Sequence, residues 1–67
     1  MKIGKLYKLK EKGKLEINKK IITNKDNYTF EIVDIEANKV LYKIKDFYCN
    51  PLWIEKILFK MIFEEVE

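Results

Sequence analysis

The stretch YTFEIVDIEANKVLYKIKD, residues 28–46, decides the fold of this chain. Both of its halves alternate between apolar and polar residues, as a strand with one buried face does. The apolar set is Tyr28, Phe30, Ile32, Val40, Tyr42 and Ile44. Glu36-Ala37-Asn38 separates the halves and is typical of a tight turn. The pattern therefore predicts an antiparallel hairpin of strands 28–35 and 39–46, with one face in the core.

Two shorter strands are predicted before this hairpin. Residues 3–10 alternate, and residues 15–18 resume the alternation after a turn at 11–14. Ile21 and Ile22 would anchor a lysine-rich loop that runs into the turn formers at 24–27.

The carboxyl-terminal segment fits two structures. Asn50-Pro51 has the form of a helix start, and apolar residues at helical spacing follow it, which favours a helix over 51–66. Residues 57–63 also alternate, which would place Phe59 and Phe63 on one face of a strand. The acidic residues at 64, 65 and 67 would lie unfavourably at the negative end of a helix. Spacing alone leaves both structures open.

Residues 39–56, KVLYKIKDFYCNPLWIEK, resemble the closing part of small Src-homology-3-like barrels of phage and mobile-element proteins. Residues 28–36 look like the central strand of the same family, although its usual opening Gly-Asp pair is here Gly4-Lys5. The resemblance implies one mainly β domain over 1–67: a barrel of about five antiparallel strands, a helical turn near 51–56 and a strand over 57–64. The alternative is an α+β fold, a four-stranded antiparallel sheet with a helix over 51–66.

Composition argues against an enzyme. The 67 residues include no His, Ser, Arg or Gln and a single cysteine, Cys49, so the usual nucleophile–base pairs and transition-metal ligand sets are missing. We expect no catalytic residue, no cofactor and no metal site. The acidic residues Glu31, Asp34, Glu36 and Asp46 are interpreted as solvated charges at strand edges. The lone cysteine fits a reducing cytoplasm, and no apolar run is long enough to span a membrane.

Lysines concentrate in the first part of the chain. Residues 1–25 hold nine lysines and two acidic residues, net +7, whereas residues 26–67 hold five lysines and nine acidic residues, net −4. Lysines on a strand and an adjoining loop could follow phosphates without reading a sequence. The candidate nucleic-acid contacts are Lys5, Lys8, Lys10, Lys12, Lys14, Lys19 and Lys20. The alternative is that these lysines only solubilise the protein and protect an edge strand from pairing.

Aromatic and apolar residues of the last third supply a second candidate site, because they exceed what a small barrel can cover. The candidate partner-binding residues are Tyr48, Trp53, Phe59 and Phe63, with Phe47 beside them. We therefore expect a non-enzymatic binding module of phage or mobile-element type that contacts a larger protein. The simplest concrete role is inhibition of a host defence protein in an anti-CRISPR-like mode. A homodimer, a nucleic-acid binder that uses the lysine face, and a sponge for a small anionic nucleotide are the alternatives; no membrane partner is expected.

Overall fold

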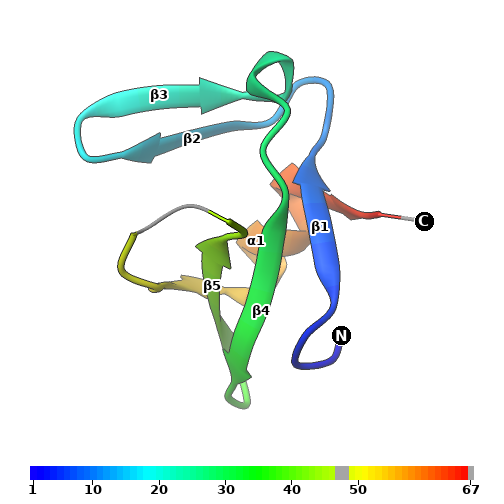
Figure 1. Ribbon diagram of the computed structural model, residues 1–67. Coiled ribbons are helices and arrows are strands. Elements are labelled where there is room, and N and C mark those ends of the chain that lie inside the picture. The colour runs from blue at the N-terminus through cyan, green and yellow to red at the C-terminus, as the bar shows by residue number, and fades with distance from the viewer. Residues whose placement is uncertain (47–48, 67) are drawn as a thin grey trace.

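The computed structural model describes residues 1–46 and 49–66 and shows a mainly β fold (Figure 1). Its main layer is an antiparallel sheet with the strand order β6-β5-β4-β1-β7, curled into a half-barrel. The strands are β1 (Leu6–Leu9), β4 (Phe30–Ile35), β5 (Lys39–Ile44), β6 (Leu52–Glu55) and β7 (Phe63–Glu65). One helix, α1 (Lys56–Ile62), connects the two edge strands β6 and β7. The mainly β prediction is confirmed, and a small Src-homology-3-like barrel is consistent with this sheet.

The predicted central hairpin is confirmed. Strands β4 and β5 pair antiparallel, with Phe30 opposite Ile44 and Ile32 opposite Tyr42. An irregularity between Ile32 and Asp34 shifts the register by one residue, so the strict alternation expected for the whole of β4 holds only for its first half.

The carboxyl-terminal boundaries differ from both predictions. Residues 52–55, expected in a helical turn near 51–56, instead form strand β6 and pair with β5. The helix covers only 56–62, so the strand over 57–64 and the helix over 51–66 are both wrong as drawn. The reason is that β5 offers a free edge to residues 52–55, while a short helix followed by β7 brings Phe59 and Phe63 together in the core.

A separate two-stranded hairpin, called the arm here, consists of β2 (Lys14–Ile17) and β3 (Lys20–Thr23). Figure 1 shows it extending away from the five-stranded sheet. The lysine-rich loop expected after residue 18 is therefore wrong, because residues 20–23 pair with β2. The turn between the strands contains only Asn18 and Lys19, with φ of 52° and 66°. Two positive φ values are what a two-residue hairpin turn of type I′ requires, and they match the twist of its strands.

The base of the arm is fixed at both ends. Thr23 caps the short 3-10 helix η1 (Asn24–Asp26): its Oγ1 accepts from the Lys25 N–H at 3.3 Å, and its own N–H donates to Asp26 Oδ2 at 2.8 Å. On the other side, a Cβ at Gly13 would lie 2.6 Å from the backbone oxygen of Ile62. Glycine is thus required where the chain enters the arm, because the backbone there presses against the end of α1.

The core is a cluster of aromatic rings that joins the sheet to α1. Phe59 stacks on Phe63 with ring centroids 4.3 Å apart, Tyr7 meets Phe59 edge-on at 4.9 Å, and Phe30 meets Phe63 edge-on at 4.9 Å. The buried apolar residues are Tyr7, Leu9, Ile22, Phe30, Ile32, Val40, Tyr42, Ile44, Phe59 and Phe63. The arm contributes Ile22 to this cluster, so its inner face is attached to the same core as the sheet.

We expect Phe59→Ala to lower the free energy of unfolding by about 3–5 kcal/mol, because it removes the ring on which Tyr7 and Phe63 pack. Ile57→Ala in the same helix is the matched control: Ile57 is 73% exposed, so its truncation should change stability by less than ~0.5 kcal/mol. Urea unfolding followed by far-ultraviolet circular dichroism measures both. Equal losses in the two variants would contradict the assignment of Phe59 to the core.

Lys19→Gly should stabilise the arm, because Lys19 has a positive φ that glycine adopts without strain and because Asn-Gly is the preferred type I′ pair. Lys20→Gly removes the same charge but falls in β3, where glycine weakens a strand, so it should have the opposite effect. Amide hydrogen exchange of the β2–β3 backbone reports both changes. Slower exchange in Lys20→Gly than in Lys19→Gly would refute the turn geometry.

Candidate functional site

No group of three or more metal-ligating side chains occurs in residues 1–46 and 49–66, and no buried side chain among them is charged. No helix in the same residues is long and apolar enough to cross a membrane. Three features of the described residues are candidates for binding: an open groove, a set of exposed lysines and an exposed apolar face.

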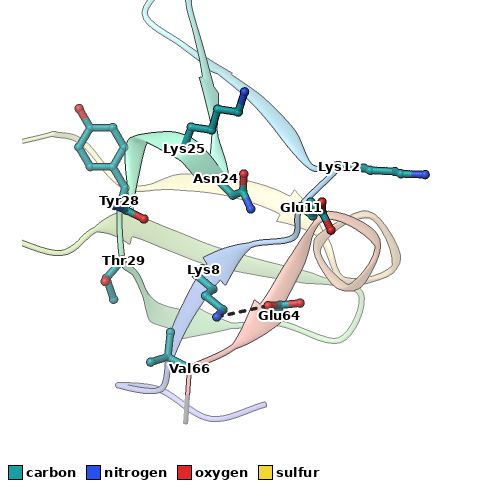
Figure 2. A pocket seen from close by; sticks show the side chains of 10 residues that line it. Lys8, Glu11, Lys12, Asn24, Lys25, Tyr28, Thr29, Glu64 and Val66 are labelled. Atoms are coloured by element: carbon teal, nitrogen blue, oxygen red, sulfur yellow. Dashed lines mark ion pairs between the residues drawn. The ribbon is translucent and has the colours of Figure 1, made fainter.

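The groove has a volume of about 930 Å³ and lies where β1, η1 and β7 meet. Figure 2 shows Lys8 and Glu64, on the neighbouring strands β1 and β7, pointing toward one another, while Lys12 extends away. The Lys8 Nζ is 3.5 Å from Glu64 Oε1, so these two charges of the groove are paired with each other. The groove is open to solvent, and Glu11, Lys12 and Lys25 also line it.

Lys8 in β1 and its neighbours Lys5 and Lys10 have partners in α1 and β7. Lys8 lies opposite Glu64 in the β1–β7 ladder, and Lys5 Nζ is 3.4 Å from Glu65 Oε1. Lys10 Nζ donates to the backbone oxygen of Lys60 at 2.8 Å. Three of the seven candidate nucleic-acid lysines therefore already have partners within the protein. Exposed pairs of this kind contribute only about 0–1 kcal/mol each, but they cancel charge on this side of the sheet.

The remaining four candidate lysines lie on the arm or at its base. We call them, together with the neighbouring Lys25, the arm lysines: Lys12, Lys14, Lys19, Lys20 and Lys25. All five are exposed, and no ion pair within the described residues involves them. Residues 12–25 contain only one acidic residue, Glu16, which leaves this segment with a net charge of +4. The structure thus divides the predicted lysine face into a neutralised strand and a cationic arm.

One face of α1 is apolar and exposed, and we call it the α1 patch. It consists of Ile57, Leu58 and Met61, which are 73%, 48% and 64% exposed. Their spacing places them on one side of the helix, opposite the buried Phe59. Trp53, in the strand that leads directly into α1, is 43% exposed. The Lys39 Nζ lies over its ring, 4.9 Å from the ring centroid, in a cation–π contact.

The predicted partner-binding residues separate into three groups. Trp53 is exposed as a contact residue would be. Phe59 and Phe63 are 0% and 2% exposed, so their assignment to a partner surface is corrected: they fill the core. Tyr48 and Phe47 lie outside the described residues. The exposed apolar residues of this region are instead those at positions 57, 58 and 61. Their helical spacing in the sequence indicates that they share one face.

Two core tyrosines have raised pKa values. Burial raises the pKa of the Tyr42 phenol above its ordinary value of 10.0, and the nearby Cys49 raises it further. Burial and Glu65 raise the pKa of Tyr7, and Lys5 partly opposes them. Both phenols are thus neutral at physiological pH, which suits a structural role in the core.

The raised pKa of Tyr42 predicts a loss of stability in alkali. A tyrosine in the unfolded chain ionises near its ordinary pKa of 10.0, whereas the folded protein holds Tyr42 neutral to higher pH. The contribution of neutral Tyr42 to the free energy of unfolding is therefore complete below pH 10, and it is lost as the pH rises from 10 through the pKa of Tyr42 in the folded protein. Above pH 10 the free energy of unfolding of Tyr42→Phe should fall less steeply than that of the unmodified protein. Parallel curves from urea unfolding would count against this assignment.

Comparison with protein-family models, curated protein sequences and solved structures finds no match for this chain. The Src-homology-3-like resemblance of residues 39–56 therefore stays a prediction at the level of family. What the protein binds has to be inferred from its own two surfaces, the α1 patch and the arm.

Proposed function

We propose that this protein is a non-enzymatic binding module that acts by protein–protein contact through the α1 patch and Trp53. The observation that carries the proposal is the exposure of Ile57, Leu58 and Met61 on one face of a helix whose other face fills the core. Large apolar side chains gathered on one face favour a contact surface over a solvated one.

The helix presents these side chains rigidly. Phe59 attaches α1 to the core, and β6 and β7 continue directly from its two ends into the sheet. A partner that binds here would not have to order a loose segment, so little of the binding energy would be lost to conformational entropy.

The charges beside the patch favour a partner of opposite sign. Helical spacing places Lys60 at the border of the patch, on the side of Ile57, and the Lys10 Nζ donates to the Lys60 backbone oxygen. A second copy bound face to face would bring these lysines close together, whereas a larger protein with an apolar pocket and an acidic rim would pair them. The concrete role that we propose is inhibition of such a larger protein by occlusion of its surface, in an anti-CRISPR-like manner.

The test is photo-crosslinking from the patch, in the cells that naturally produce the protein. A photoreactive phenylalanine analogue replaces Ile57 in one variant and the exposed Lys45 in a control variant. We expect position 57 to give an adduct with one larger protein, and Lys45 to give none. An adduct heavier by only 8.1 kDa would reveal a second copy and refute the proposal, as would equal crosslinking from both positions.

The partner found in this way then allows a quantitative check with purified components. Leu58→Asp places a charge at a half-exposed position of the patch and should weaken binding at least tenfold, as loss of a central apolar contact does. Circular dichroism must show the variant folded. Unchanged affinity in a folded variant would exclude the patch as the contact surface.

A further inference from the structure

The arm offers a second surface, separate from the α1 patch, and its chemistry differs. The patch is apolar, whereas residues 12–25 carry five lysines and one acidic residue. We propose that the arm binds the phosphate backbone of duplex DNA, with the β2–β3 ribbon lying in the major groove. This inference goes beyond the proposed protein contact and does not rest on it.

The distribution of the arm lysines fits a ribbon between two phosphate walls. Lys19 is in the turn at the tip, Lys14 and Lys20 are at opposite ends of the paired segment, and Lys12 and Lys25 flank its base. Lysines that lie along both strands of a ribbon can reach phosphates on both sides of a groove. A two-stranded ribbon is also one of the two elements that the major groove of B-form DNA, about 12 Å wide, admits.

The rest of the molecule leaves the arm lysines available and holds the ribbon in place. Lys8 and Lys5 are paired with Glu64 and Glu65, and those acidic residues make no ion pair with the arm within the described residues. Ile22, 4% exposed, attaches the inner face of the ribbon to the core. The capping interactions of Thr23 and the close approach at Gly13 fix its base. A ribbon held in this way loses little freedom on binding.

The composition of the arm favours duplex over single-stranded nucleic acid, and backbone contact over sequence readout. Residues 12–25 contain no aromatic residue, so the arm has no platform on which unpaired bases could stack. The chain has no arginine or glutamine, and the only amide side chain at the tip is Asn18, so base-edge recognition would be slight. Duplex RNA should bind more weakly, because its major groove is too deep and narrow for the ribbon.

The test is fluorescence anisotropy of the purified full chain with a labelled 20-base-pair DNA duplex of mixed sequence, over a range of potassium chloride concentrations. With about four phosphate contacts, the logarithm of the association constant should fall with a slope of about −3.6 against the logarithm of salt. Between 50 and 200 mM salt, the affinity should therefore fall roughly 150-fold. A single-stranded oligothymidine and an RNA duplex of equal length should each bind more weakly than the DNA duplex.

Two variants with equal charge changes locate the binding surface. The double variant Lys14→Glu, Lys19→Glu should weaken duplex binding at least tenfold. Because it loses about two phosphate contacts, the slope of log K against log salt should become less negative by about 2. The double variant Lys2→Glu, Lys56→Glu changes the net charge by the same amount, away from the arm. Lys56 lies at the β4–β5 turn, where its N–H donates to the Asn38 backbone oxygen. This control variant should retain most of the affinity for the duplex. Circular dichroism must show both variants folded.

Three results would overturn the proposal. They are the absence of duplex binding at 50 mM salt, an equal loss of affinity in the two charge variants, and binding to single-stranded DNA or duplex RNA as tight as that to duplex DNA. The last result would show that the lysines contact nucleic acid without the ribbon occupying a DNA groove.

Discussion

The stack of Phe59 on Phe63 is the contact on which the rest of this structure depends. A sheet of five strands leaves an open side between its edges β6 and β7, and the chain closes that side with a single short helix. Phe59 faces inward from the helix and Phe63 from the strand after it, so one pair of rings joins α1, β7 and, through Phe30 and Tyr7, the centre of the sheet. A chain of this length has few other residues with which to build a core.

The same closure explains why the charge asymmetry along the sequence does not produce a molecule with two opposite faces. β7 pairs with β1, so the acidic carboxyl-terminal residues Glu64 and Glu65 lie across from lysines of the basic amino-terminal segment. The positive charge that remains is concentrated on the arm, which belongs to a different sheet and lies outside this ladder. The topology, more than the composition, determines where the molecule is cationic.

The sequence predicts those parts of the fold in which the apolar residues follow one spacing, either that of a strand or that of a helix. Residues 28–32 and 39–45 follow a two-residue period on either side of a clear turn, and the hairpin forms as expected. Residues 19–23, Lys-Lys-Ile-Ile-Thr, do not alternate, and Asn18-Lys19 is a weak turn signal, so β3 was not predicted. Residues 57–63 satisfy both helical and strand spacing, and only the free edge of β5 and the space for two rings in the core decide between them.

The residues of the candidate sites are likewise only partly predictable from the sequence. A sequence shows that Phe59 and Phe63 are large and apolar, but which apolar residues enter the core follows from the exact residue at which β6 ends and α1 begins. A shift of that boundary by one residue rotates the helix by about 100°, which would exchange buried and exposed side chains. The exposure of the lysines follows from the sequence, because a charged side chain stays outside wherever that boundary falls, whereas their ion pairs depend on the strand order. Both surfaces finally depend on single buried residues, Phe59 beneath the α1 patch and Ile22 beneath the arm. Each surface is therefore held by the core without being part of the five-stranded sheet, so residues on either one can change without altering the barrel.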